Sequence, residues 1–447
     1  MNVNQHIKPA EFARRRKRLM HMMGKASVAI LPAAPTQLRN RDAEHAYRQD
    51  SDFYYLTGFN EPEAVLVLIP KRKHGEVILF CRERDPEMET WHGRRAGLEG
   101  AMEFYGADDA FPIDDIDDIL PGLLESSERV FYAMGCDTQF DQHVTGWVNQ
   151  LKEQSRAGVH TPKEFVALDH LLHDMRLYKS RAEVAAMRKA AKISAQAHVR
   201  AMRTCRPGKW EYEIEAEFQH HFKQHNFANA YTPIVGGGEN GCILHYTENN
   251  AELKDGDLLL IDAGAENECY AADITRTFPV NGVFNPEQKA LYQIVLDAQL
   301  AAIDQVRPGN HWNDPHEAAV RVLTKGLIKL GLLKGTLRTL IKDQAYRTFY
   351  MHRTGHWLGL DVHDVGDYKV GEAWRELEPG MVLTVEPGLY IAPGTKVGNR
   401  TVAKKWQGIG IRIEDDVLVT TDGCEILSKD APKAIADIEA IMAEHAT

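Results

Sequence analysis

The segment from Gly256 to Phe284 contains two apolar runs, and each of them carries a carboxylate. The first run ends at Asp262, and the second contains Asp273. Short apolar runs bounded by polar residues predict strands, so we expect a hairpin here. With Asn267 and Glu268 at its tip, the two acids lie opposite each other on one face, about 5 Å apart at Cβ.

Two carboxylates at that distance repel each other unless they share a proton or bind a cation. The hairpin therefore indicates a metal site. Two exposed acids at the ends of strands are the alternative, and this segment alone favours neither interpretation. The choice depends on whether other segments supply further ligands.

Composition limits the class of protein. A chain of 447 residues with 44% hydrophobic residues is long enough for two globular domains. A net charge of -11 and a pI near 6.0 argue against nucleic acid or an anionic membrane surface as a partner. The six cysteines lack metal-binding spacing and no apolar run of about 18 residues occurs, so we expect a cytoplasmic protein without a membrane span.

Residues 1–177 are expected to form a mixed α/β domain without metal ligands. A helix is predicted over residues 9–23, and short strands over residues 27–31, 53–56, 64–69, 76–81 and 129–133. The loop from Trp91 to Arg95 is polar and aromatic, so its tryptophan could reach a neighbouring active site. An ordinary anchoring tryptophan is the alternative.

Residues 178–447 are expected to form the second domain. Ser180 and Glu183 form a capping box at the start of a long helix that runs to about Thr204. The order of long helix, Arg-Pro-Gly, shorter helix and acid-bearing strands then occurs twice, with the tripeptides at 206–208 and 307–309. Such a repeat predicts two half-domains related by a pseudo-twofold axis, each contributing acids to one central site.

The second half of this repeat supplies further ligands. His352, His356 and His363 occur in a short segment broken by glycine, which predicts a loop and strand lining a pocket. Glu386 ends one apolar strand, and Glu414 lies within another, where a charge requires a partner. The candidate metal ligands are therefore Asp262, Asp273, His356, Glu386 and Glu414.

Four carboxylates and one neutral imidazole would neutralise two divalent cations. Hard oxygen donors with one histidine and no thiolate favour Mn²⁺, with Co²⁺, Fe²⁺ or Zn²⁺ as alternatives. Two such ions can hold a bridging hydroxide and polarise a carbonyl group, which is the chemistry of hydrolysis. No G-x-S-x-G or P-loop motif competes, and the glycine run at 236–241 lacks the following helix that phosphate binding requires.

Together these residues resemble the pita-bread metallopeptidases, the family of prolidase, methionine aminopeptidase and creatinase, and within it the Xaa-Pro aminopeptidases (aminopeptidase P). The likeness covers nearly the whole chain. Creatinase lacks the metal ligands, and methionine aminopeptidase lacks the N-terminal domain, whose motifs lie at residues 51–64 and 91–95. In the catalytic half the likeness rests on five motifs in order, at residues 243–249, 261–279, 356–364, 385–390 and 410–415.

The resemblance implies a division of the metal ligands. Asp262 and Glu414 would contact both metal ions, while Asp273 would contact one and His356 the other. Glu386 would be a ligand and would also carry the proton of the bridging hydroxide.

The resemblance also implies roles for residues around the metal centre. His245 and His363 would hydrogen-bond the substrate and the oxyanion. Arg412 would orient Glu414 or Asp262. The residues implied to contact the rest of the substrate are His352, Tyr390 and Trp91. One departure from the family pattern is the segment 353–355, Arg-Thr-Gly, where relatives have a small turn containing glycine.

The implied activity is hydrolysis of the N-terminal Xaa-Pro bond of peptides by a metallo-exopeptidase, a homodimer or homotetramer formed through its N-terminal domain. No arginine is assigned to the C-terminal carboxylate of the substrate, which favours tripeptides and longer peptides. Prolidase, which cleaves Xaa-Pro dipeptides, shares the metal centre and is the nearest alternative. A non-catalytic pita-bread binding module is a further alternative, but it would be expected to have lost metal ligands.

Overall fold

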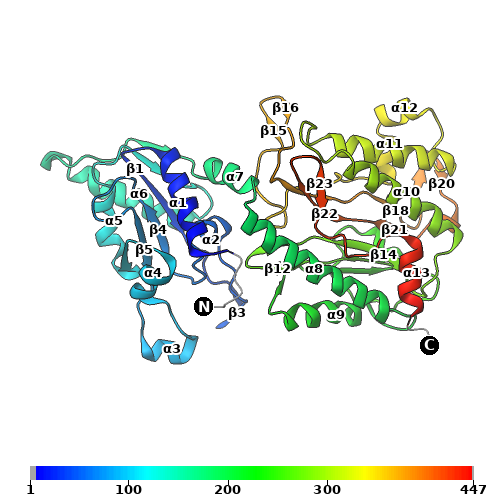
Figure 1. Ribbon diagram of the computed structural model, residues 1–447, viewed down its shortest axis with the longest axis horizontal. Coiled ribbons are helices and arrows are strands. Elements are labelled where there is room, and N and C mark those ends of the chain that lie inside the picture. The colour runs from blue at the N-terminus through cyan, green and yellow to red at the C-terminus, as the bar shows by residue number, and fades with distance from the viewer. Residues whose placement is uncertain (1–6, 445–447) are drawn as a thin grey trace. The chain divides into compact units, whose positions relative to one another are not determined.

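The computed structural model describes residues 7–444, in two compact units divided between Arg176 and Leu177 (Figure 1). This division lies one residue before the expected boundary. Each unit has its own sheets and its own hydrophobic core. None of the described helices is long and apolar enough to cross a membrane.

A six-stranded mixed sheet with the order β6-β5-β4-β1-β7-β8 organises the N-terminal unit. Its buried aliphatic residues pack against the tryptophan of α6 and the leucines of α5. The strands are β1 Ser27–Pro32, β2 Leu38–Asn40, β3 Ala43–Glu44, β4 Val65–Leu68, β5 Val77–Cys81, β6 Asp109–Pro112, β7 Arg129–Phe131 and β8 Glu164–Val166. The helices are α1 Pro9–Met23, α2 Ser51–Thr57, α3 Pro86–His92, α4 Gly97–Tyr105, α5 Ile116–Leu124, α6 Thr138–Glu153 and α7 Asp169–Leu177.

One predicted strand of this unit is wrong, while the other predicted segments correspond to α1, β1, β4, β5 and β7. Residues 53–56 are aromatic and resemble a strand, but they lie in helix α2. Asp50 accepts a hydrogen bond from the N–H of Phe53 (2.8 Å), and Gly58 ends the helix at a φ of 65°. These caps, and the burial of all four side chains, outweigh strand propensity.

The C-terminal unit begins with the predicted capping box. The Ser180 hydroxyl accepts a hydrogen bond from the N–H of Glu183 (3.4 Å), whose carboxylate accepts one from the N–H of Ser180 (2.8 Å). Helix α8 then runs over Arg181–Thr204, as expected. The later helices are α9 Glu211–Gln224, α10 Pro286–Ile303, α11 Asp314–Lys329, α12 Leu337–Lys342 and α13 Ile435–Ala443.

The expected internal repeat is present as two matching helix pairs, α8 with α9 and α10 with α11. Each pair is joined through Arg-Pro-Gly, and the two glycines have the same positive φ, 87° at Gly208 and 86° at Gly309. After each glycine, the carbonyl of the following residue accepts a hydrogen bond of 2.7 Å from a distant leucine. Leu253 donates to Lys209 in the first copy, and Leu377 donates to Asn310 in the second. The central strands of the unit lie between the two helix pairs (Figure 1).

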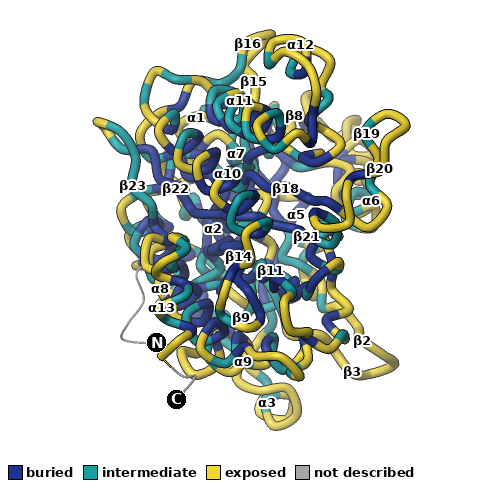
Figure 2. The backbone as a smooth tube through the Cα atoms, turned by 90° about the vertical axis from the view of Figure 1, so that its right-hand side faces the viewer, coloured by how far each residue is buried: buried dark blue, intermediate teal, exposed yellow. Residues whose placement is uncertain are grey.

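Small antiparallel sheets form the centre of this unit, chiefly β10-β11-β14, β17-β22-β23 and β18-β21. Figure 2 shows β11, β14, β21 and β22 buried in the interior. The strands are β9 Ala228–Asn229, β10 Ile234–Gly237, β11 Leu258–Asp262, β12 Ala265–Asn267, β13 Tyr270–Ala271, β14 Thr275–Pro279, β15 Lys369–Val370, β16 Ala373–Trp374, β17 Val382–Val385, β18 Gly388–Ile391, β19 Lys396–Val397, β20 Arg400–Thr401, β21 Ile409–Arg412, β22 Asp415–Val419 and β23 Cys424–Ile426.

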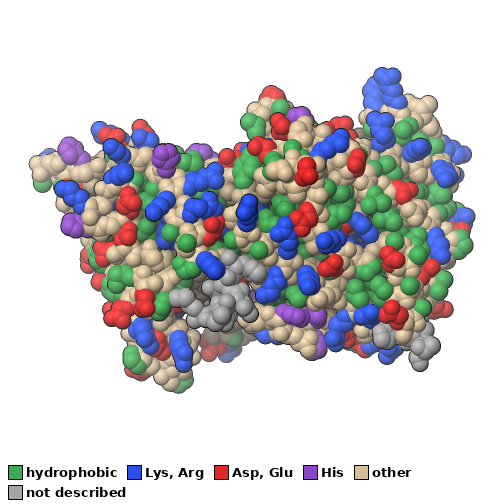
Figure 3. Space-filling view, in the orientation of Figure 1, with side chains coloured by type: hydrophobic (Ala, Val, Ile, Leu, Met, Phe, Trp, Pro, Cys, Tyr) green, Lys and Arg blue, Asp and Glu red, His purple; other side chains and the backbone are tan. Residues whose placement is uncertain are grey.

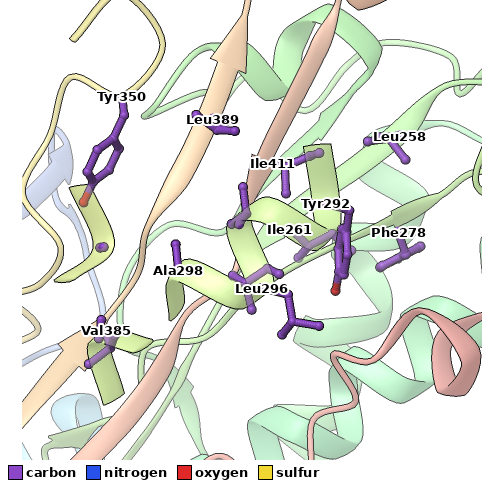
Figure 4. Packing of buried hydrophobic residues seen from close by; sticks show 14 of the residues in the cluster. Leu258, Ile261, Phe278, Tyr292, Leu296, Ala298, Tyr350, Val385, Leu389 and Ile411 are labelled. Carbon is purple, nitrogen blue, oxygen red and sulfur yellow. The ribbon is translucent and has the colours of Figure 1, made fainter. Parts of the chain in front are cut away.

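Helix α10 joins the two halves into one core. Its Tyr292 and Leu296 pack with Ile261 and Phe278 from the first half and with Ile411 from the second (Figure 4). Such close packing resists small displacements. The strand ends that carry the acids are therefore fixed relative to each other.

The predicted register of the acidic hairpin is wrong by two residues. Asp262 lies opposite Thr275, and the tip of the hairpin is Glu268 and Cys269. Both tip residues have positive φ, 51° and 64°, the conformation of a tight turn that asparagine or glycine normally supplies. Asp273 therefore lies in an irregular segment between β13 and β14 instead of within a strand.

Positively and negatively charged side chains are mixed on the face of the molecule seen in Figure 3. Lysine and arginine side chains alternate there with aspartate and glutamate across both units. The net charge of -11 is thus not gathered into one patch on that face.

Candidate metal centre

The candidate ligands from both halves of the repeat line one cavity of about 380 Å³ in the C-terminal unit. Asp262 and Asp273 come from the first half, and His356, Glu386 and Glu414 come from the second. The cavity therefore lies where the half-domains meet. Its lining residues are Leu244, His245, Asp262, Asp273, His352, Arg353, Gly355, His356, His363, Tyr368, Glu386, Arg412 and Glu414.

The acids lie at or next to places where strands begin or end. Asp262 is the last residue of β11, and Glu386 directly follows β17. Glu414 interrupts what was expected to be one strand, because β21 ends before it and β22 begins after it. Its N–H donates instead to the carbonyl of Thr275 (3.1 Å), which links the two halves at the site.

Three of the predicted ligands are close enough to bind the same ion. Nε2 of His356 lies 3.3 Å from Oδ2 of Asp273, and a ligand atom of Glu414 lies within 4.8 Å of both. Asp273, His356 and Glu414 thus form one set of donors. The implied division, with Asp273 on one ion and His356 on the other, stays a prediction.

The cavity holds more negative charge than its own cations balance. Burial raises the pKa of Glu386 to about 7, although His356 and Arg412 oppose the shift. Burial, with the charges of Asp273 and Glu386, raises the pKa of Glu414 well above its ordinary value. Burial also raises the pKa of Asp262, against Arg412. Without an added cation, these carboxylates cannot all be ionised.

The excess of negative charge in the cavity also changes the pKa of one histidine, His356. Burial alone would lower the pKa of His356, but its contact with Asp273 and the charge of Glu386 raise that pKa to about 9. The carboxylates around His356 therefore favour a positive charge at this position. Oxygen donors with one imidazole and no thiolate fit Mn²⁺ or a related divalent cation, so the side chains present suit the metal centre that the sequence predicts.

Arg412 orients one of the two expected carboxylates. Its Nη2 donates to Oδ2 of Asp262 (2.6 Å), while Nε donates to the hydroxyl of Thr275 (3.0 Å). That hydroxyl in turn donates to Oε2 of Glu414 (2.5 Å). The guanidinium therefore holds Asp262 directly and Glu414 through Thr275.

Sequence reasoning missed Tyr231 as well as Thr275. The Tyr231 hydroxyl lies 2.5 Å from Oδ1 of Asp262 and 2.6 Å from Oδ1 of Asp273, and it donates to this pair. Burial and the two aspartate charges raise the pKa of this tyrosine well above its ordinary value, so it remains a donor. Tyr231 precedes Asp262 by 31 positions and belongs to no motif, so nothing in the local sequence marks it.

The predicted substrate-contacting residues divide into two groups. His245, His352 and His363 line the cavity, and the His363 ring packs edge-on against His356 with centroids 4.4 Å apart. Tyr390 does not line the cavity, because its side chain is buried and its hydroxyl is 2.9 Å from Nε2 of His352. The Tyr390 hydroxyl therefore helps to position the His352 ring.

Trp91 lies in the N-terminal unit, at the end of helix α3, and its side chain is 77% exposed. It is therefore not the buried anchor that was the alternative interpretation. Its proposed contact with an active site stays a prediction.

The chain is similar to metallopeptidases of known family. A family model described as metallopeptidase family M24 matches residues 185–421. The chain belongs to this family. A model of the aminopeptidase P N-terminal domain matches residues 12–132, so both units have counterparts in known proteins.

Individual relatives share the full length of the chain. The Xaa-Pro aminopeptidase of Escherichia coli (strain K12) is 48% identical over 438 residues, which cover 98% of each chain. Among solved structures, aminopeptidase PepP of Pseudomonas aeruginosa has a TM-score of 0.97 and 62% identity, covering 98% of this chain and 99% of its own. Proline aminopeptidase P II of Yersinia pestis has a TM-score of 0.94 and 49% identity, covering 98% and 100%.

These relatives confirm the expected α/β fold of this M24 chain, a pita-bread catalytic domain preceded by an aminopeptidase P type N-terminal domain. They also confirm the expected enzyme class, a metallo-exopeptidase. The relatives are Xaa-Pro aminopeptidases, which favours that activity over the prolidase alternative.

Proposed function

We propose that this M24 enzyme removes the first residue from peptides whose second residue is proline, using two divalent cations. The observation that carries the proposal is the convergence of five ligand-type side chains from both half-domains on one cavity. Those residues are Asp262, Asp273, His356, Glu386 and Glu414. When bound, such cations supply Lewis-acid polarisation of the scissile carbonyl and acidify water.

The side chains of the cavity perform the remaining steps. Glu386, buried beside His356, accepts a proton from the attacking water and returns it to the leaving nitrogen. His245 and His363 donate hydrogen bonds to the substrate carbonyl as it becomes an oxyanion, an effect worth about 3 kcal/mol. His352 lies against the proline ring, held by the Tyr390 hydroxyl.

Proline after the scissile bond sets the specificity. An imide nitrogen has no hydrogen and its φ is fixed, so a site that relies on an amide donor cannot recognise it. The histidines of this cavity offer donors to carbonyl oxygens and require no N–H from the substrate. Metal ions held by these carboxylates and His356 would supply a ligand position for the free amino terminus, and chain length beyond the proline is not restricted.

Product analysis tests this function. Ala-Pro-Ala is expected to release alanine and Pro-Ala rapidly, Ala-Pro more slowly, and Ala-Ala-Ala hardly at all. Turnover of Ala-Pro alone would replace the proposal with prolidase. Equal cleavage of Ala-Ala-Ala would exclude both activities.

We further propose Mn²⁺ as the native metal, with Co²⁺, Fe²⁺ or Zn²⁺ as alternatives, because oxygen donors dominate the site. Metal analysis of protein purified without added metal tests the identity and the expected ratio of two ions per chain. A cytoplasmic location fits the six scattered cysteines, which lack metal-binding spacing.

The N-terminal unit is proposed to form a homodimer or homotetramer in which Trp91 approaches a neighbouring site. Support comes from the exposure of this large apolar side chain and from a unit in which no metal-ligand cluster is found among its described residues. Light scattering tests the assembly. A monomer with full activity at assay concentration would overturn it.

A further inference from the structure

Arg353 lines the catalytic cavity but has no part in the machinery described above. Its guanidinium donates from Nη2 to Oδ1 of Asn313 (2.5 Å), and its Cζ lies 5.1 Å from the centre of the Trp374 ring. These two contacts hold an exposed arginine in one place. Among the described residues, no carboxylate lies within ion-pair distance of it.

A fixed guanidinium without an acidic partner is suited to bind one from a ligand. Arginine has five N–H donors in a planar fork that matches a carboxylate, and the contact with Asn313 uses one of them. The other arginine of the cavity, Arg412, is buried and bonded to Asp262, Thr275 and Tyr390. Arg353 is therefore the cavity arginine that remains available to a substrate.

The position of Arg353 in the chain indicates which part of a peptide it meets. It directly follows His352, the residue proposed to contact the proline ring. The side chain contacts Asn313 at the start of α11 and Trp374 of β16. The residue after proline lies about 3.5 Å further along an extended peptide, beyond the proline contact.

We propose that Arg353 binds a carboxylate carried by the third residue of the substrate. In a tripeptide this is the C-terminal carboxylate, and in a longer peptide it is the side chain of aspartate or glutamate. The proposal rests on the proposed function and adds a substrate preference to it. It also supplies the carboxylate-binding arginine that sequence analysis did not assign.

Three peptides test the proposal and distinguish the two sources of the carboxylate. Ala-Pro-Ala has a terminal carboxylate, Ala-Pro-Ala amide has none, and Ala-Pro-Asp amide has only a side-chain carboxylate. The wild-type enzyme is expected to show a KM about tenfold lower for at least one carboxylate peptide than for Ala-Pro-Ala amide. The peptide with the lower KM identifies the source.

Substitutions assign the effect to this residue. Arg353→Met is expected to raise the KM of the preferred carboxylate peptide to that of the amide, with kcat unchanged. Arg353→Lys keeps the charge without the fork and should give an intermediate KM. Lys369→Met is the matched control, because Lys369 lies 4.8 Å from the same Trp374 ring but is not a lining residue of the cavity.

Each outcome decides between the proposals. Equal KM values for all three peptides in the wild type would overturn the role of Arg353 while leaving the aminopeptidase activity intact. A similar loss on every peptide in Arg353→Met, with an unchanged melting temperature, would assign Arg353 to positioning His352. Failure of the wild type to cleave any of the peptides would overturn the proposed function, and this inference with it.

Discussion

Glu414 and Asp415 are adjacent in the sequence and equally buried, but they have opposite surroundings. Glu414 faces the cavity with three other carboxylates, and its pKa lies well above the ordinary value. Asp415 accepts hydrogen bonds from Arg276 (2.7 Å) and Lys433 (2.6 Å). Although burial favours the protonated acid, these two cations hold the pKa of Asp415 well below its ordinary value.

The difference between these two acids distinguishes a charge that stabilises the fold from a charge that is available to a ligand. Around Asp415 the chain supplies its own counter-ions, and Ser428 and Gln299 add hydrogen bonds of 2.6 Å. Around Glu414 the chain supplies too few, which is costly unless a ligand restores the balance. A buried acid within a strand therefore indicates function when its neighbours leave it uncompensated.

Removing a ligand on the uncompensated side should have the largest effect. Asp273→Asn or His356→Ala is expected to lower kcat/KM for Ala-Pro-Ala by about 10³-fold or more, because each removes a donor from the metal centre. For Asp273→Asn, the melting temperature of the metal-free protein should not fall, since one of the crowded like charges is lost. Glu425→Gln, in an exposed ion pair with Arg188, is the control. Full activity after exhaustive chelation would contradict a metal mechanism.

Removing the acid on the compensated side should instead affect folding. Asp415→Asn removes the negative charge that faces Arg276, which is fully buried, and Lys433. We expect the free energy of unfolding to fall by about 3–5 kcal/mol, measured by urea denaturation. A loss below about 1 kcal/mol would mean that the network does not stabilise the fold, and would remove the contrast with Glu414.

The candidate ligands could be selected from the sequence because four of them are carboxylates in or beside an apolar run. Local patterns of this kind also predicted helix α8 and its cap at Ser180. The register of the hairpin could not be predicted, since its turn places Glu268 and Cys269 at positive φ without glycine. Helix α2 was missed because its capping and burial override a strand-like sequence.

The sequence does not reveal a residue whose role depends only on contacts with residues far away in the chain. Tyr231 has no neighbours in sequence that share its role, and folding alone brings it to Asp262 and Asp273. Tyr390 is the opposite case, because a family motif marks it, whereas its buried hydroxyl lies against His352 and Arg412. Its contact with the substrate stays a prediction. Assigning these residues required the tertiary structure.

After chelation removes the metal ions, the free energy of unfolding should depend on pH because the carboxylates of the cavity are uncompensated. In the metal-free protein the pKa of Glu386 is about 7, whereas an unfolded glutamate titrates near about 4.3. Above about pH 4.3 the unfolded chain loses a proton that the folded protein keeps, so stability falls as pH rises towards 7. We expect a loss on the order of 2–3 kcal/mol between pH 5 and 7.5.

The matched variant for this experiment is Glu386→Gln, which has no proton to lose at this position. Its metal-free form should show a smaller decrease of stability over the same pH range. Urea midpoints at both pH values measure the effect, and identical slopes in the two proteins would contradict it. Adding Mn²⁺ at 100 times its dissociation constant should stabilise the wild type by about 2.7 kcal/mol.

The smallest effect is expected at an intermediate case, Asp52 in the N-terminal unit, which is partly exposed and has two cationic partners. Burial opposes its ionisation, but His173 (3.7 Å) and Arg176 (2.9 Å) lower the pKa of Asp52, and Asp52 raises that of His173. The aspartate contributes stability above about pH 4, and the histidine contributes it below about pH 6.5. As pH rises through the raised pKa of His173, that contribution is lost.

Solvent screening should limit the loss to about 0.5 kcal/mol. His173→Gln should remove this part of the decrease in the urea midpoint between pH 6 and 9 in the metal-loaded enzyme, and an unchanged decrease would show that the pair does not stabilise the fold.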